Sequence, residues 1–331
     1  MIENKKASIL LVLKVLEEYS DKDHLMTQQD IIDKIYTIYG IELERKSVSN
    51  SIKLLEELNY DIVKGAKGGV ALLSRLFDET EASFLIDSIF SSKSINAIQA
   101  KQICKSISSC FSKYQRKDYS YLFKSKDINR STNKDVFYNI SIINEAIKNN
   151  KKIGFKYLAY DKLGNKTVRK DGYEYIVSPY YLINNYGRYY LLCNYNEKYR
   201  PLQVFRIDFI IDINIKNDSE LKPFEKLKNI PENFSITKYI NEHIYFFSGE
   251  VVDATLLLEN ESAILNFKDW FGELAKIEKI DDKIIAKVRC DENALCYWAL
   301  QYCSNVKILS PSSLVEKVKE NLYNAIKKYG E

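Results

Sequence analysis

The sequence predicts an α+β protein of several domains, because the spacing of its apolar residues changes along the chain. Residues 8–149 repeat apolar residues at the three- and four-residue spacing of helices. Residues 152–215 alternate apolar with polar residues, as β-strands do. From residue 251 the expected elements follow the order β-α-β-β-α-β, which is the split βαβ, or ferredoxin-like, pattern. A chain of 331 residues is long enough for two or three domains.

Composition and charge exclude several classes of protein. Hydrophobic residues make up 46% of the chain, and no run reaches the roughly 18 apolar residues that a membrane span needs. The first residues do not form a signal peptide, so we expect a cytoplasmic protein with no membrane partner. Six cysteines without a Cys-x-x-Cys pair are expected to be small buried residues. His24 and His243 have no ligand spacing, so we expect no metal, no cofactor and no enzyme activity.

The first 75 residues predict a winged helix-turn-helix, which is a DNA-binding arrangement. Apolar spacing predicts a helix over residues 8–18, and the capping-box spacing of Thr27 and Asp30 begins a second helix. A third helix is expected over residues 45–58 as the recognition helix. Two short apolar strands then flank residues 64–69, whose glycines permit the tip of a hairpin, the wing.

Charge supports DNA binding by its placement and not by its total. Residues 1–75 hold 11 Lys/Arg and 12 Asp/Glu, but the windows 45–53 and 62–75 hold three cations each and no acid. We expect these windows to form one acid-free face toward phosphates, with Asn50 reading an adenine. The alternative is a solvated surface on a protein-binding winged helix. The predicted DNA-contacting residues are Thr27, Gln28, Arg45, Lys46, Ser47, Ser49, Asn50, Lys53, Lys64 and Lys67.

Residues 76–134 predict a positively charged helical linker. Asp78 and Glu81 have the spacing of another capping box, and a second linker helix is expected from residue 94 to about residue 114. Residues 93–134 carry ten Lys/Arg against two Asp, a net charge of +8. Two interpretations stay open: an electrostatic surface for nucleic acid or another anion, and a solvated linker.

Four strands are expected over residues 152–160, 167–183, 188–195 and 202–215, in a small, strongly curved sheet or barrel behind a helix over residues 136–149. The segment Ile143–Ile215 resembles a WYL domain, whose fold is an Sm-like small β-barrel. The resemblance rests on Phe155-Lys156-Tyr157, on Ser178-Pro179, on Tyr189-Tyr190-Leu191 in place of Trp-Tyr-Leu, and on the strand Gln203–Ile210.

This resemblance implies an effector site that binds a nucleotide or a nucleic-acid fragment through arginines, whose planar forks grip phosphate bidentately. Gln203 and Phe209 stand where the family usually has arginines, so only Arg206 of three remains. Arg206 and Asp208 could alternatively form a structural ion pair. Arg188 and Arg200 lie near enough in sequence to restore part of the charge. The candidate ligand-binding residues are Tyr157, Ser178, Arg188, Tyr189, Arg200, Arg206 and Asp208.

The segment Trp298–Pro311 and the amphipathic helix after it resemble the WCX-type C-terminal extension of WYL regulators, which takes part in dimer contacts in that family. The expected division is a winged helix over 1–75, a helical linker over 76–134, a WYL domain over 135–216, a linker over 217–249 and the extension over 250–331. The resemblance implies a ligand-responsive transcriptional regulator that binds double-stranded DNA as a homodimer. The alternative is an accessory protein of a defence system that binds RNA or single-stranded DNA, mainly through residues 93–134.

Overall fold

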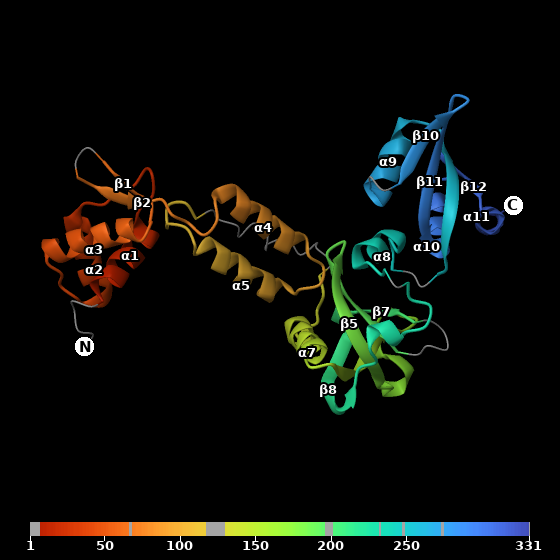
Figure 1. Ribbon diagram of the computed structural model, residues 1–331, viewed down its shortest axis with the longest axis horizontal. Helices are drawn as coiled ribbons and strands as arrows, with labels where there is room; N and C mark the ends of the chain where they lie inside the picture. The colour runs from red at the N-terminus through yellow and green to blue at the C-terminus, as the bar shows by residue number, and fades with distance from the viewer. Residues whose placement is uncertain are drawn as a thin grey trace. The chain divides into compact units, whose positions relative to one another are not determined.

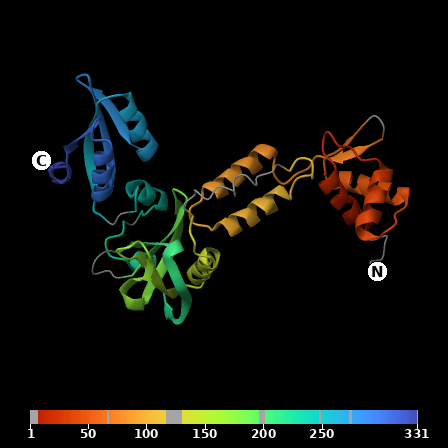
Figure 2. The same ribbon diagram turned by 180° about the vertical axis from the view of Figure 1, so that it is seen from behind.

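The chain divides into two compact units in its computed structural model (Figure 1 and Figure 2). The first unit comprises Met1–Tyr138 and Asn184–Tyr189, and the second comprises Asn139–Ile183 and Tyr190–Glu331. No helix within the described part of the chain is long and apolar enough to cross a membrane. The residues described are 7–65, 68–116, 130–195, 201–231, 233–246, 249–272 and 275–330.

The first unit begins with three helices and a hairpin, in the order that the sequence predicts. The hairpin strands are antiparallel, with Ile62 opposite Leu72. Val12, Ile31 and Val48, one from each helix, are 0% exposed and meet in a single core. The elements are α1 (Ser8–Tyr19), α2 (Gln28–Tyr39), α3 (Arg45–Glu57), β1 (Ile62–Lys64) and β2 (Val70–Leu72).

Local sequence signals determine where α2 begins and ends. The Thr27 hydroxyl accepts a hydrogen bond from the Asp30 N–H at 3.2 Å, and the Asp30 carboxylate accepts one from the Thr27 N–H at 2.8 Å. This is the predicted capping box, which satisfies two N–H groups that the helix itself cannot. Gly40 ends the helix with φ +67°, a left-handed conformation that favours glycine.

A pair of helices follows, α4 (Glu79–Ser91) and α5 (Ala97–Ser108). Asp78 and Glu81 form the predicted capping box of α4. The prediction of a single helix over 94–114 is wrong in extent. Asn96 caps α5 by accepting from the Gln99 N–H at 3.0 Å, so residues before it cannot continue the helix. After residue 108 the chain turns toward the N-terminal helices.

That turn is held by the buried carboxylate of Asp21, which is 3% exposed. Its oxygens accept hydrogen bonds from the Ser112 hydroxyl and contact the His24 ring, both at 2.7 Å. The His24 ring stacks on Tyr114, with centroids 3.8 Å apart. Burial by itself would raise the pKa of Asp21, but the hydrogen bonds from Ser112 and His24 outweigh it and hold the pKa below its usual value.

The second unit contains a six-stranded sheet. The strand order is β4-β3-β5-β6-β7, and β8 pairs with β3, so β3 is the central strand. Helix α7 (Val136–Lys148) precedes β3 in the chain, and Phe155 of β3 is fully buried. The strands are β3 (Lys151–Tyr160), β4 (Lys166–Val168), β5 (Tyr175–Asn185), β6 (Arg188–Asn194), β7 (Gln203–Arg206) and β8 (Ile210–Glu220).

Two of the predicted strands are broken, and both breaks have a local cause. The segment expected as one strand over 167–183 contains a 3-10 turn, η1 (Arg169–Gly172), in which Lys170 and Asp171 have φ near +50° and cannot continue a strand. The segment expected over 202–215 contains a second turn, η2 (Ile207–Phe209). The Asn139 side chain braces η2 by donating to the carbonyls at both of its ends.

The C-terminal part of the second unit is a four-stranded antiparallel sheet in the order β10-β11-β9-β12. Phe267 and Trp298, one from each of two helices, are 0% exposed in its core. The predicted order β-α-β-β-α-β is present. Before it come η3 (Phe224–Lys226) and α8 (Ile236–Glu242), and the elements themselves are β9 (Val251–Leu258), α9 (Glu261–Phe271), β10 (Lys276–Ile280), β11 (Lys283–Asp291), α10 (Glu292–Gln301), β12 (Val306–Ser310) and α11 (Ser312–Lys328).

The six cysteines are free thiols, and the expectation that all are buried is only partly right. Cys110 is half-buried and Cys303 is exposed. The remaining four, Cys104, Cys193, Cys290 and Cys296, are buried.

The Asp21 junction predicts a measurable change in local stability. Asp21→Asn removes the charge that accepts these hydrogen bonds, so we expect residues 111–116 to open more easily by about 2 kcal/mol. Because the folded-state pKa is lowered, the same stabilisation is present above the unfolded-state pKa of Asp21 and is lost as pH falls through the folded-state value. Amide hydrogen exchange of the full chain measures both effects. Asp23→Asn, an exposed neighbour, is the control; equal exchange in both variants would contradict the prediction.

Candidate nucleic-acid interface and effector site

Helix α3 carries its polar side chains away from the core of the first unit. Lys46, Asn50 and Lys53 are exposed, and their spacing of four and three residues places them on one side of the helix. The predicted neighbours Ser47 and Ser49 are half-buried. Among the described residues neither Lys46 nor Lys53 has a carboxylate partner.

The predicted acid-free face is not free of acid, and this expectation is wrong. Lys64 Nζ lies 2.6 Å from Glu56 Oε1 of α3. Glu42 and Glu44 line a surface hollow together with Lys46 and Asn50. These acids lie outside the two sequence windows, but the helix and the hairpin bring them next to the cations in space.

The second window contributes less positive charge than its sequence indicates. Arg75 turns inward, and its Nη2 donates to the Ser20 carbonyl at 2.7 Å. Lys64 is paired with Glu56, as described above. Lys67 lies outside the described residues. Among the described cations of the two windows, the open ones are therefore those of α3.

Residues at the start of α2 have structural roles that the sequence did not fully reveal. The Thr27 hydroxyl is used in the capping box, and Gln28 is half-buried. Gln29, which sequence reasoning missed, accepts a hydrogen bond from Arg45 Nη2 at 3.1 Å and so connects α2 with α3. The sequence signal for this contact is the position of Gln29 in the first turn of the second helix.

Arg206 is the centre of the second candidate site. Its Nε and Nη2 donate to the two carboxylate oxygens of Asp208 at 3.1 and 2.7 Å, and its guanidinium carbon lies 4.3 Å from the centre of the Phe209 ring. The structural ion pair, one of the two interpretations from sequence, is therefore present. The Arg206 side chain is 31% exposed, and its Nη1 makes no hydrogen bond within the described residues, so this group is open to a ligand.

Tyr157 contacts the backbone of Arg206 and the neighbouring aromatic rings. Its hydroxyl accepts a hydrogen bond from the Arg206 N–H at 3.0 Å, and its ring packs against Phe205 at 5.1 Å. Burial raises the pKa of Tyr157 to about 12, so the phenol stays neutral at ordinary pH. Tyr157, Arg206 and Asp208 are the predicted ligand residues that the structure brings together.

The other predicted ligand residues that the structure describes make no hydrogen bond with Arg206. Ser178 is buried, and its hydroxyl accepts a hydrogen bond from the Lys222 N–H at 2.9 Å, which is a structural role. Arg188 and Tyr189 belong to the first unit, where the Tyr189 N–H donates to the Ser94 hydroxyl at 2.7 Å. Arg200 lies outside the described residues.

Two cations near Arg206 were missed from sequence. Lys166 Nζ lies 5.7 Å from the centre of the Phe209 ring. Arg169 is close enough to Tyr157 for its charge to oppose the rise in the pKa of that phenol. Both belong to the run Lys166–Lys170, and of its three cations Arg169 and Lys170 fall within the strand expected over 167–183.

Gln203 and Phe209, which replace two of the expected arginines, make contacts within the domain. The Gln203 side chain accepts a hydrogen bond from the Tyr195 N–H at 2.7 Å. Phe209 is 8% exposed and lies beneath the Arg206 guanidinium. The additional positive charge near Arg206 therefore comes from β4 and the turn η1 and not from the strand that carries Arg206.

Residues 139–215, which contain this site, match the WYL domain family model. These residues are a WYL domain. No curated protein sequence matches the chain. The proteasome accessory factor B/C (PafBC) of Arthrobacter aurescens is a similar solved structure, at 16% identity and a TM-score of 0.30, with coverage of 98% of this chain and 49% of that one. The chain thus spans about half the length of that protein. A CRISPR Cas-related protein is similar at 16% identity and a TM-score of 0.40, with coverage of 98% and 84%.

The Arg206–Asp208 pair predicts a difference between two aspartates of the WYL domain. Asp208→Asn leaves the half-buried guanidinium without its anion, so we expect a loss of about 1–2 kcal/mol, less than for a fully buried pair because Arg206 is partly exposed. Asp212→Asn is the matched control: its carboxylate is 61% exposed and pairs with the exposed Lys156, so a change near zero is expected. Urea denaturation of both variants measures the difference. Equal losses would show that the Arg206–Asp208 pair adds nothing to stability.

Proposed function

We propose that this protein is a DNA-binding transcriptional regulator whose WYL domain senses a nucleotide or a nucleic-acid fragment. The observation that carries the proposal is the open polar side of α3, with Asn50 between Lys46 and Lys53, in a chain that also has a WYL domain. In this proposal α1–α3 with the β1–β2 hairpin act as a winged helix-turn-helix. The WYL domain is taken as an Sm-like barrel and the C-terminal sheet as a ferredoxin-like, WCX-type domain.

The spacing on α3 suits a recognition helix. Lys46 and Lys53 are seven residues apart, which is roughly 10 Å along a helix axis. Asn50 lies between them, where its amide can pair with adenine while the two lysines contact phosphates. A homodimer would place two such helices about one turn of DNA apart.

The effector site in this proposal is centred on Nη1 of Arg206, whose side chain is 31% exposed. Lys166 and Arg169 add positive charge near it, so an anionic group of the effector would meet more than one cation. The proposal includes no catalytic step. His24 is paired with Asp21, and His243 contacts the Tyr239 carbonyl at 2.8 Å.

The alternative, an RNA- or single-strand-binding accessory protein, depends on the cations of residues 93–134. Several of these have structural roles. Arg116 pairs with Glu18, and Arg130 donates to the carbonyls of residues 89, 90 and 92. Lys113 lies over the rings of Tyr19 and Tyr114. Lys117, Lys124 and Lys126 lie outside the described residues. These contacts use three of the cations internally, while Lys93, Lys101, Lys105 and Lys134 are exposed.

DNA binding by α3 is tested with two substitutions and a control. Asn50→Ala is expected to cost about 1–3 kcal/mol on the preferred sequence and to relax the preference at one base pair. Lys53→Ala is expected to weaken binding to all sequences and to lower the salt slope by about 1. Lys14→Ala, an exposed lysine of α1, should change neither. Affinities are measured against salt, on DNA from upstream of the gene and on scrambled DNA. Wild-type behaviour of both α3 variants would refute the proposal.

Effector sensing predicts a separate phenotype. Arg206→Ala is expected to keep the DNA affinity of the wild type but to lose its change upon addition of nucleotides or short single strands, because the open Nη1 donor and its positive charge are gone. Lys156→Ala removes an exposed cation of the same domain and should leave the response intact. DNA-binding titrations with and without the added nucleotides measure this. A response that survives in Arg206→Ala would assign Arg206 a purely structural role.

A further inference from the structure

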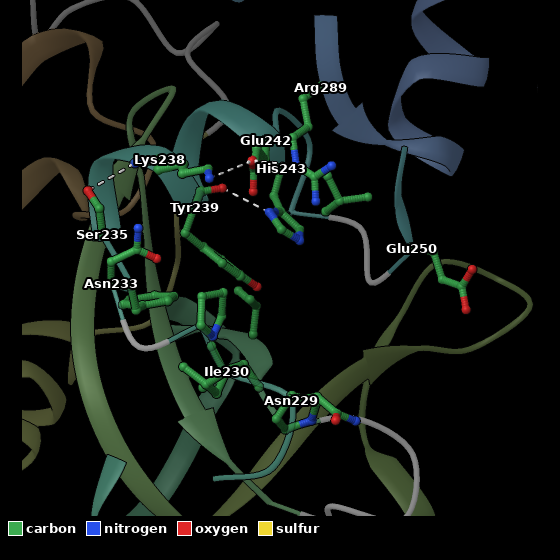
Figure 3. A pocket seen from close by; sticks show the side chains of 17 residues that line it. Asn229, Ile230, Asn233, Ser235, Lys238, Tyr239, Glu242, His243, Glu250 and Arg289 are labelled. Carbon is green, nitrogen blue, oxygen red and sulfur yellow. Dashed lines mark hydrogen bonds and ion pairs between the residues drawn. The ribbon is translucent and has the colours of Figure 1, made fainter. Parts of the chain in front are cut away.

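The second unit contains a cavity of about 480 Å³ that is separate from the Arg206 site (Figure 3). Its walls come from the start of β7, from residues 229–231 and 233–235, from α8, and from the neighbouring ends of β9 and β11. From the sequence, residues 217–249 are expected to form only a linker. A volume of this size lies within the range of about 300–1,000 Å³ that is common for small-molecule sites.

The wall formed by α8 is firmly anchored. Ile236 and Ile240 of α8 pack against the apolar cluster of the WYL domain that includes Leu192. After the helix, Phe246 enters the same cluster, while Ile244 enters the core of the C-terminal sheet. Two cores thus determine the position of the α8 wall of the cavity.

One side of the cavity is aromatic. The rings of Tyr239 and His243 stack with their centroids 4.0 Å apart and their planes at 17°. Figure 3 shows both side chains projecting from α8 toward the cavity, with Ile230 on the opposite side. The Tyr239 carbonyl can only accept a hydrogen bond, so His243 Nδ1, 2.8 Å away, carries the proton and fixes the ring orientation. Aromatic and aliphatic walls that face each other suit a flat, partly apolar ligand.

The charges of the cavity balance within the protein. Its cations are Lys238 and Arg289, and its carboxylates are Glu242 and Glu250. Arg289 donates to Glu242 at 3.1 Å and to Asp253 at 2.9 Å, and Lys238 Nζ lies 3.9 Å from Glu242. No surplus positive charge remains for a phosphate, and burying an unpaired charge is costly. An uncharged ligand is therefore favoured.

Two side-chain amides provide specific hydrogen bonds. Asn229 and Asn233 line the cavity beside Ile230, and neither side chain has a hydrogen-bond partner within the described residues. A side-chain amide carries both donors and an acceptor. It therefore matches a ligand edge that alternates donors and acceptors, as the edges of nucleobases do.

We propose that this cavity binds an uncharged, planar heterocycle of the nucleobase or nucleoside class. The ring lies against the Tyr239–His243 wall, and its polar edge meets Asn229 and Asn233. This site is independent of the anionic effector proposed for Arg206. It would stand even if the DNA-binding function failed.

Calorimetric titration of the full chain tests the proposal, with adenosine, guanosine, cytidine and uridine as probes and their 5′-monophosphates for comparison. We expect at least one nucleoside to bind. Asn233→Ala should weaken it roughly three- to tenfold, because one hydrogen bond is lost. Asn233→Trp should abolish binding by filling the cavity from an exposed position. Thr237→Ala, an exposed residue of α8 that does not line this cavity, is the control and should bind as the wild type does.

A third variant separates this site from the Arg206 site. Arg206→Ala should leave nucleoside binding unchanged. Three outcomes would overturn the proposal: no heat from any nucleoside at about 1 mM, binding that survives in Asn233→Trp, and binding that is lost in Arg206→Ala. A monophosphate that binds the Arg206→Ala protein more tightly than its nucleoside would also overturn it, because the cavity would then favour negative charge.

Discussion

The buried carboxylate of Asp21 is the interaction on which the first unit depends. A carboxylate that is 3% exposed is tolerated only when its oxygens accept hydrogen bonds, and here Ser112 and His24 supply them. The preceding residue extends the junction, because the Ser20 hydroxyl accepts a hydrogen bond from the Leu72 N–H at 3.0 Å. The end of α1 therefore joins the hairpin and residues 111–116 to the three N-terminal helices. Under the proposed function, a conformational change that reaches α3 through residues 111–116 would have to pass through the Asp21 junction.

Arginines and lysines have different uses in this chain. Arg116, Arg130 and Arg289 each make several hydrogen bonds to distant segments, Arg75 makes one, and Arg206 makes two to Asp208 in its own segment. A guanidinium has five donors in a fixed plane, so it can satisfy two or three acceptors at once, which an ammonium group on a flexible stem does less well. Lys46 and Lys53 remain open on α3. Net charge is consequently a poor guide to the nucleic-acid surface here, since many of its positive charges are used internally.

The WYL domain lacks two of its three expected arginines, but the site around Arg206 still carries positive charge. The Phe209 ring packs against the Arg206 guanidinium, and the Asp208 carboxylate accepts hydrogen bonds from it. Strand β4 and the turn η1 bring Lys166 and Arg169 toward the same region. The proposed anion site is thus assembled from two segments of the domain. The sequence of the strand that carries Arg206 therefore indicates only part of this anion site.

The sequence by itself determined the local elements. Capping boxes at Thr27 and Asp78 set the starts of two helices, and alternation of apolar residues set the strands, because these signals act between residues that are close in the chain. Only the tertiary structure decided which charges are open. Glu56 lies beside Lys64, and the Gly187 carbonyl accepts from the Lys93 N–H, although these partners are far apart in sequence. The cavity beside α8 is also decided by the tertiary structure. Its walls come from several segments that are far apart in sequence and that only packing brings together.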